Sequence, residues 1–369
     1  PPPPPHPPPP PPPPHTRPWS SAASDVYKRQ LKTRDEVKDE LIELVGEDED
    51  KNSFKQIQLD EYLDAIRPEI MQTDPDISKI GVIVARGIIL DGPQPAGRIG
   101  GDTLSDLIRK ARRDDKIAAI VLRIDSPGGS ALASETIRKE IELTRQEGKP
   151  VIASMSSIAA SGGYWISSAA DEIWASPTTI TGSIGIYGAF VTLEKSLDSL
   201  GIHSDGVGTT RLSDAFDPAR PLNTVLADSM QQSIENNYRR FIQLVAEGRN
   251  LEATEVEKIA QGRVWAGKTA RELGLVDKFG NLQDAVQSAA DLAAIGEFDV
   301  IYIEQDLTAR EKLIRRLNQF LLKTFNIALG EITHPVVELY GNFGRNLGQI
   351  LELNDPRGIY AYCMMCEIQ

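Results

Sequence analysis

The chain has 369 residues, a hydrophobic content of 40% and a formal net charge of -13. This length accommodates one large domain with extensions, and the acidic balance argues against nucleic-acid binding as the main role. The two cysteines, Cys363 and Cys366, are too few for a disulfide framework. No run of about eighteen apolar residues occurs, so the sequence predicts no membrane-spanning helix.

The first thirty residues differ from the rest in composition. Residues 1–18 hold fourteen of the 25 prolines and predict an extended, polyproline-like tail. One interpretation is a ligand for a proline-recognising domain. Residues 20–30, S-S-A-A-S-D-V-Y-K-R-Q, resemble translated adapter sequence, and we therefore interpret residues 1–30 as a non-native tail.

Residues 31–46 are predicted to form a helix, because an apolar stripe recurs at helical spacing and Gly46 follows as a stop signal. Residues 71–76, M-Q-T-D-P-D, are predicted to be a linker into the main domain.

The main domain begins with alternating strands and helices. Buried strands are predicted at residues 77–90 and 117–125, and helices at residues 103–113 and 131–146. The Gly-rich turn S-P-G-G-S joins the second strand to the second helix. This order predicts an α/β fold of repeated βαβ units, with ligands bound at the carboxyl ends of the strands.

The segment 151–190 carries most of the small hydroxyl side chains that suit catalysis. Val151 to Met155 predict a buried strand, and Ser161 opens a segment of helix-compatible composition. Gly162 and Gly163 permit close approach of a ligand, and amides at a helix start stabilise a developing oxyanion. Ser161 is therefore the candidate nucleophile.

A serine nucleophile needs a base that removes its proton. His203 is the one histidine in this domain, and a strand or surface histidine is the simpler interpretation of it, so a Ser-His-Asp triad is poorly supported. A Ser/Lys arrangement is the alternative, with a lysine whose pKa is lowered by burial.

Six sequence blocks follow one another along the chain: I-D-S-P-G-G-S (124–130), A-A-S-G-G-Y-W-I-S (159–167), T-G-S-I-G-I-Y-G (181–188), G-R-V-W-A-G (262–267), G-L-V-D-K-F-G (274–280) and the terminal N-D-P-R-G-I-Y-A-Y-C-M-M-C. In this order they resemble the signal peptide peptidase A (protease IV) family, and the resemblance covers about residues 31–369.

The resemblance implies a ClpP/crotonase-like fold over residues 77–300 and a Ser/Lys endopeptidase that degrades cleaved signal peptides. It implies that backbone amides of Gly128, Gly129 and Gly162 form the oxyanion hole. Ser183, in T-G-S-I-G, is implied to hydrogen-bond the catalytic lysine, although a structural serine in a tight turn is an equal interpretation from the residues alone.

The long bacterial form of that family has two similar halves, with the serine in the second half and the lysine in the first. This chain resembles the second half, preceded at residues 31–76 by a remnant of the first. The family also has short, single-domain relatives, and the position of their lysine corresponds to Ser213 in this chain. The nearby Arg211 cannot act as a general base, because its guanidinium stays protonated. The resemblance therefore implies a missing N-terminal half that supplies the lysine.

The resemblance also implies a homo-oligomer associated with the bacterial inner membrane on its extracytoplasmic face. Neither a cofactor nor a metal site is predicted. Cys363 and Cys366 form a C-x-x-C that we interpret as neither a metal half-site nor a redox pair.

The rest of the chain is predicted to be mostly helical. Helices are expected at residues 191–200, 224–247, 254–257 onward and 280–293, with a strand at 202–207. A helical extension is expected over residues 301–369. There Leu313, Leu317, Leu321 and Phe325 share a face beside basic residues, which suits either an anionic membrane surface or a neighbouring subunit.

Two further functional classes stay open: a catalytically silent scaffold of protease fold, and a crotonase relative that handles acyl-CoA. Failure of a fluorophosphonate to label the chain, even with the missing half restored, would indicate the scaffold. Tight coenzyme A binding would indicate the crotonase relative.

Overall fold

The computed structural model describes residues 33–48, 53–57, 62, 77–190, 192–305, 353–364 and 366. The chain divides into two compact units, Pro1–Thr73 and Asp74–Gln369.

The first unit contains the predicted N-terminal helix, α1 (Arg34–Val45). Thr33 caps it through a capping box with Glu36, and Gly46 ends it with a φ of 85°. Such a box satisfies amides that lack partners within the first turn. No residue of α1 is buried, and Val37, Leu44 and Val45 of its apolar stripe are exposed.

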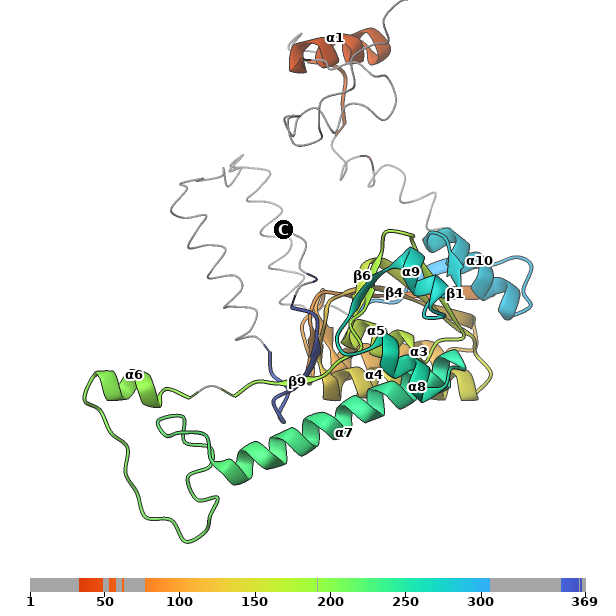
Figure 1. The fold of residues 1–369 in the computed structure, drawn as a ribbon. Helices are drawn as coiled ribbons and strands as arrows, with labels where there is room; N and C mark the ends of the chain where they lie inside the picture. Colours follow the sequence, from red (N-terminus) through yellow and green to blue (C-terminus); the bar gives the residue numbers. More distant parts are fainter. Residues whose placement is uncertain are drawn as a thin grey trace, which may run out of the picture. The chain divides into compact units, whose positions relative to one another are not determined.

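The second unit is built on an eight-stranded sheet (Figure 1). Its main path runs β10-β8-β6-β4-β1-β12, while β7 pairs with β6 and β11 pairs with β7. All pairings are parallel except that of β10 with β8. The strands are β1 (Lys79–Arg86), β4 (Ile117–Ser126), β6 (Val151–Ala160), β7 (Glu172–Ala175), β8 (Ile180–Gly182), β10 (Val264–Ala266), β11 (Lys278–Phe279) and β12 (Asp299–Tyr302). This parallel sheet confirms the predicted α/β fold of βαβ units.

Helices cover both faces of this sheet because successive strand residues point to opposite sides. Ile120 and Leu122 of β4 belong to the larger core cluster, beneath α3 (Gly101–Arg113), α4 (Ala131–Gln146) and α5 (Gly162–Ser167). Ala119 and Val121 belong to a second cluster with α10 (Leu282–Leu292). The sheet is therefore buried on both sides, which explains its apolar strand sequences.

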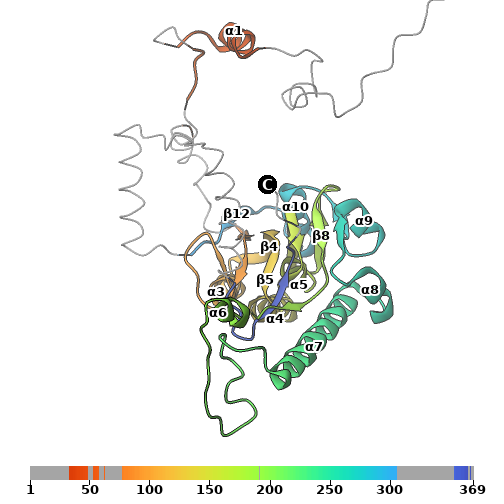
Figure 2. The ribbon, with the colours of Figure 1, turned by 60° about the vertical axis from the view of Figure 1, so that its left-hand side comes forward.

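A second sheet, of five short strands, lies at the carboxyl end of β4 (Figure 2). Its order is β3-β2-β5-β13-β9, with β2 (Ile89–Leu90), β3 (Ile99–Gly100), β5 (Gly128–Ser130), β9 (Tyr187–Gly188) and β13 (Ile359–Tyr362). The single strand predicted at residues 77–90 is wrong in one respect. It breaks at Gly87, whose φ of 97° suits glycine, and β2 joins the second sheet.

The segment between the sheets and α10 is mainly helical. It contains α6 (Glu194–Ser199), α7 (Thr224–Arg249), α8 (Ala253–Ile259) and α9 (Gly267–Glu272). The strand predicted at residues 202–207 is absent, and these residues lie exposed in a loop without a neighbouring strand. Among the helices that the structure describes, none is long and apolar enough to cross a membrane.

The C-terminal part differs from the expected helical extension where it is described. Residues 359–362 form β13, a fully buried strand of the second sheet. The apolar face proposed for residues 313–325 lies outside the described residues.

Candidate active site

Ser161 lies where the central strand β6 turns into α5. It is 1% exposed, and its φ of 54° and ψ of -114° are unusual for a residue other than glycine. Its amide donates to Gly182 O (2.9 Å), and its carbonyl accepts from the Trp165 amide (2.8 Å). The hydroxyl makes no capping bond to the helix. A strained backbone that leaves the hydroxyl free is typical of a functional position.

Ser183 lies beside Ser161 because of the sheet register. Ala160 at the end of β6 pairs with Gly182 at the end of the parallel strand β8, and each serine is the next residue. Ser183 also has a positive φ, of 51°, and its amide donates to Arg263 O (2.7 Å). The two hydroxyl-bearing turns thus lie at the same edge of the sheet.

Both serines line one pocket with a volume of about 610 Å³. Its other walls come from the segment around β9, from α7, from the turn before β10 and from the C-terminal segment. The other lining residues are Gly185, Ile186, Tyr187, Gln231, Ile234, Glu235, Tyr238, Gln261, Gly262, Tyr362, Cys363 and Met364. The apolar and aromatic members give the pocket a chemistry that suits apolar peptide side chains.

Two tyrosines of this lining, Tyr187 and Tyr238, stay protonated at neutral pH. Burial raises the pKa of Tyr187 to about 12. Burial, followed by the hydrogen bond to Glu257, raises the pKa of Tyr238 to about 12 as well. Within the described ranges the lining contains neither lysine nor histidine. The pocket therefore holds a candidate nucleophile but no evident neutral base.

The glycines expected to form the oxyanion hole lie close to Ser161. Gly128 (φ 101°) and Gly162 are so near that a Cβ on Gly128 would lie 2.6 Å from the Gly162 nitrogen. The Gly128 amide donates to Ser126 Oγ (3.1 Å). The Gly162 amide is in the first turn of α5, where amides lack intrahelical partners.

The third glycine of this group faces β13. Gly129 is opposite Ala361 in an antiparallel pairing, and Cys363 N donates to Pro127 O (2.8 Å) two residues further along. Hydrogen-bonded pairs recur every second residue in such ladders, so the Gly129 amide is directed at Ala361.

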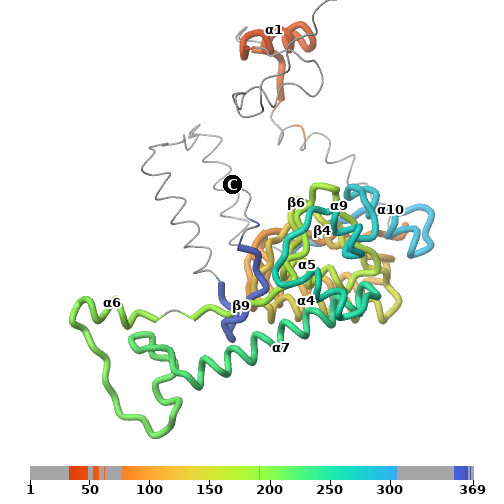
Figure 3. Tube along the Cα trace, viewed as in Figure 1, coloured from red at the N-terminus to blue at the C-terminus, as the bar shows by residue number. Residues whose placement is uncertain are grey.

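The other candidate bases lie elsewhere. The side chain of His203 is 72% exposed in the loop after α6, with Nδ1 3.5 Å from Asp198, and it does not line the pocket. The loop that carries His203 and Ser213 lies away from the end of β6 (Figures 2 and 3). The structure thus gives His203 the surface position that the simpler interpretation assigned to it.

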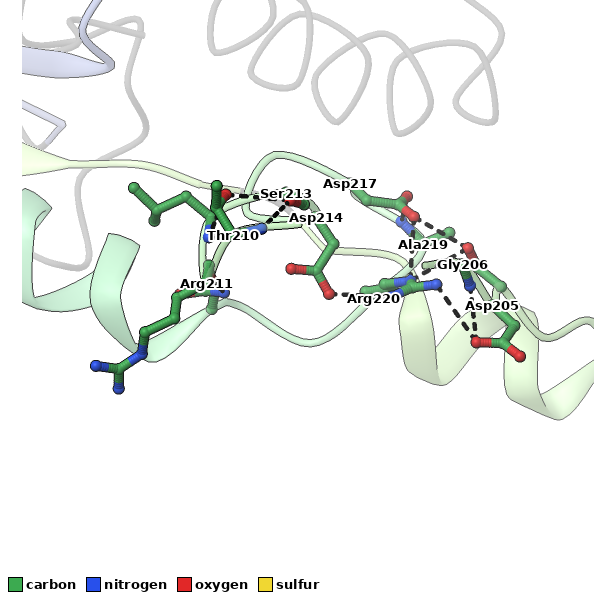
Figure 4. Close-up of polar contacts among 12 residues, drawn as sticks. Asp205, Gly206, Thr210, Arg211, Ser213, Asp214, Asp217, Ala219 and Arg220 are labelled. Atoms are coloured by element: carbon green, nitrogen blue, oxygen red, sulfur yellow. Dashed lines mark hydrogen bonds and ion pairs between the residues drawn. The ribbon is translucent and has the colours of Figure 1, made fainter. Parts of the chain in front are cut away.

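Ser213, which stands at the position of the lysine in the short relatives, is exposed. Its hydroxyl accepts from the Thr210 amide (3.0 Å), and the side chain of Arg211 points away from these contacts (Figure 4). Arg220 holds the same loop together through Asp214 (3.0 Å) and a longer contact with Asp217 (3.5 Å). No base reaches Ser161 from this loop.

Helix α7, which forms one wall of the pocket, is held to α4 and α5 by Glu135. This carboxylate accepts hydrogen bonds from Arg138 Nε (2.7 Å), Trp165 Nε1 (2.9 Å) and a nitrogen of Arg240 on α7 (3.1 Å). Burial by itself would raise the pKa of Glu135, but these donors outweigh it and leave the pKa lowered. The ionised carboxylate therefore links the nucleophile-bearing helix to the pocket wall.

We expect Glu135→Gln to reduce the unfolding free energy by about 1–3 kcal/mol at pH 7, because charged hydrogen bonds are lost. A lowered folded-state pKa contributes stability above the unfolded-state value of about 4.3 and loses it as the pH falls through the folded value. Urea unfolding from pH 7 to pH 3 should therefore show the two proteins converging below about pH 4. Glu272→Gln, at the exposed end of α9, is the control. A constant difference across this range would contradict the contribution of the ionised carboxylate.

The two cysteines, whose pairing the sequence left open, form a disulfide in the structure, Cys363–Cys366. Sequence reasoning also missed Tyr187, Ile234 and Tyr238 as pocket residues. Tyr187 lies just after T-G-S-I-G in the sequence, which could have indicated it, whereas Ile234 and Tyr238 lie on α7, whose sequence shows only a helical pattern.

Across the described ranges, no group of three or more His, Cys, Asp or Glu side chains is arranged to hold a metal ion.

These features define a parallel α/β protein with a buried serine at a strand-to-helix turn, and comparisons with known proteins agree. Residues 143–296 match Peptidase family S49. Protease 4 of Salmonella typhi is 40% identical over 90% of this chain and 53% of its own length, and Protease 4 of Haemophilus influenzae is 40% identical over 90% and 54%. A candidate protease of Synechocystis is 35% identical over 60% of this chain and 79% of its own length.

The chain belongs to peptidase family S49, a family of serine proteases. It spans about half the length of the Protease 4 relatives. Among solved structures, it is similar to a ClpP1 mutant from Listeria monocytogenes, with 16% identity over 56% of this chain and 94% of that chain, at a TM-score of 0.35. A membrane-bound stomatin-specific protease with a substrate peptide is 17% identical over 66% and 99%, at a TM-score of 0.41.

Proposed function

We propose that this chain carries the nucleophilic half of a serine endopeptidase that works with a Ser/Lys dyad. The observation that carries the proposal is the position of Ser161, buried and strained at a strand-to-helix turn, next to Ser183 in an apolar pocket. Among the described residues the lining holds no lysine, and Ser213 stands where short relatives have one, so in this proposal the lysine comes from a segment outside this chain. The length of the Protease 4 relatives supports this assignment.

In the proposed reaction the Oγ of Ser161 attacks a peptide carbonyl carbon while the neutral lysine amine takes the hydroxyl proton. The amide of Gly162 stabilises the oxyanion, and the amides of Gly128 and Gly129 join it once they release Ser126 Oγ and Ala361. Collapse breaks the C–N bond, and the lysine passes its proton to the leaving amine. Water then hydrolyses the acyl-enzyme by the same route. Ser183 donates to the lysine amine and holds it neutral.

The proposed substrates are hydrophobic remnants of cleaved signal peptides, which the apolar lining of the pocket suits. For the longer protein, the proposal includes a homo-oligomer attached to the bacterial inner membrane on its extracytoplasmic face. These elements follow from the family resemblance of the sequence blocks.

Mixing tests the proposed split of the dyad. The chain alone, and the chain mixed with a lysine-bearing N-terminal half from a Protease 4 relative, are assayed on a fluorogenic hydrophobic peptide. We expect hydrolysis only in the mixture, because an unassisted serine is a weak nucleophile at neutral pH. Serine-dependent hydrolysis by the chain alone would show that a base within these residues serves Ser161 and would overturn the split.

A further inference from the structure

A second pocket, with a volume of about 400 Å³, lies on the sheet face that α10 covers. Arg123 of β4 lines it, together with polar residues of β6, of the turn between β7 and β8 and of the segment that enters α10. Arg123 follows Ala119 and Val121 at the two-residue period of a strand, and both of these pack in the cluster with α10. The pocket shares no lining residue with the pocket of Ser161.

The guanidinium of Arg123 contacts only uncharged acceptors. Its Nη1 donates to Ser154 Oγ (2.9 Å) and to Met155 O (3.0 Å), and its Nη2 donates to Ser156 Oγ (3.0 Å). Among the residues that the structure describes, Arg123 has no carboxylate within 4.0 Å, the distance that defines an ion pair. Arginine carries five N–H donors, and it is rarely buried without a charged partner. The site therefore leaves donors and a positive charge unmatched.

The surroundings of Arg123 disfavour its charge. Burial lowers the pKa of this half-buried side chain, and the nearby Asp125 offsets that effect only in part. The Asp125 carboxylate is engaged elsewhere, because it accepts from the Ile158 amide (3.3 Å) and lies 3.8 Å from Arg86 Nε. A guanidinium stays protonated even so, and a bound anion would compensate its charge.

The rest of the lining supplies further hydrogen-bond donors. Ser156 accepts from Arg123, so its own hydroxyl proton is left for another acceptor. Ser176 Oγ and Thr178 Oγ1 are 3.2 Å apart, and one of these two hydroxyls keeps its proton available. Asn281 uses its Oδ1 to cap α10 (2.7 and 3.2 Å), which leaves its NH2 group as a donor. Within the described part of the chain, the lining contains neither Asp nor Glu.

We propose that this pocket binds a phosphate group, carried by a small soluble ester or by a lipid headgroup, with Arg123 as its charged ligand. The donors come from β4, β6, the β7–β8 turn and the segment before α10, and a tetrahedral phosphate presents oxygens in several directions. The two oxygens of a carboxylate would be satisfied by one guanidinium fork alone. The volume leaves room for the rest of an ester. This site does not depend on the proposed peptidase function.

Two substitutions should remove phosphate binding for different reasons. We expect the wild-type chain to bind inorganic phosphate with a Kd of about 1 mM, the affinity that two or three charge-assisted hydrogen bonds provide. Arg123→Gln removes the charge and should weaken binding by at least about tenfold. Ser156→Asp places a carboxylate at the atom that accepts from Nη2, so it should neutralise the guanidinium and abolish binding without lowering Tm.

Isothermal titration calorimetry of the full chain, at pH 7 and constant ionic strength, measures binding of inorganic phosphate, glycerol 3-phosphate and acetate. Arg113→Gln is the matched control, because it removes the same charge from an exposed arginine at the end of α3. We expect both phosphates to bind the wild type and this control, and neither to bind Arg123→Gln or Ser156→Asp with comparable affinity. Acetate should bind at least about tenfold more weakly than phosphate.

Vesicle flotation distinguishes the two sources of the phosphate group. Phosphatidylcholine vesicles are compared with and without phosphatidic acid. Binding that needs both phosphatidic acid and Arg123 identifies a lipid headgroup, whereas binding of glycerol 3-phosphate without vesicle binding identifies a soluble ester.

Thermal unfolding reports the fold of each variant. Absence of phosphate binding to the wild type at about 10 mM would overturn the inference, as would equal binding in a folded Arg123→Gln. If Arg123→Gln does not fold, Ser156→Asp decides, and undiminished phosphate binding in that variant would remove the site. Acetate that binds as tightly as phosphate would overturn the assignment to a phosphate group.

Discussion

Replacing Ser161 with alanine is expected to lower kcat/KM for peptide hydrolysis by at least about 10³-fold, in the chain mixed with a lysine-bearing half. The hydroxyl oxygen is the only part removed. Alanine keeps the Cβ that the native serine already places at a φ of 54°, so the substitution adds no backbone strain. Hydrolysis of a fluorogenic peptide and labelling by a fluorophosphonate both report the loss.

Ser157→Ala is the matched control, because Ser157 is an exposed serine on the same strand β6. Its activity and labelling should equal those of the wild type. If fluorophosphonate labelling survives in Ser161→Ala and is abolished by replacing a different serine, that other serine is the nucleophile.

Gly128→Ala is expected to disrupt both the fold near β5 and any oxyanion hole there. The new Cβ would lie 2.2 Å from Ala361 O and 2.6 Å from the Gly162 nitrogen, both backbone atoms, at a φ of 101°. We expect a loss of more than about 2 kcal/mol in unfolding free energy, and about 10²-fold or more in kcat/KM when the lysine-bearing half is present. Urea unfolding and peptide hydrolysis measure the two effects.

Gly148→Ala separates backbone strain from crowding. Gly148 also has a positive φ, of 87°, but an added Cβ would meet nothing within 4 Å. The unfolding free energy of this control should fall by only about 1–2 kcal/mol, and its peptide hydrolysis should stay at the wild-type level. An equal loss of unfolding free energy in both variants would show that the positive φ alone makes Gly128 necessary. The close approach of β13 and Gly162 would then not be the reason.

The sequence by itself determined the elements whose signals are local. The apolar runs before Ser126 and Ser161 are β4 and β6, and α4 covers the predicted residues 131–146. The strand β6 continues to Ala160, beyond the predicted Val151 to Met155, and Ser161 then opens the helix at the predicted strand-to-helix turn. Chain order alone also indicated the βαβ arrangement, since parallel strands require crossover connections.

Only the tertiary structure decided which distant segments meet at the serine. The parallel register of β6 and β8 brings Ser183 next to Ser161, and no local pattern encodes a register between strands. The insertion of β13 between β5 and β9 joins residues more than 170 positions apart. It is held by the buried Asp355, which the sequence presents only as part of a turn-like N-D-P-R-G. The predicted strand at residues 202–207 failed for the same reason. A segment becomes a strand only where a neighbour accepts its hydrogen bonds, and none of the described strands pairs with these residues.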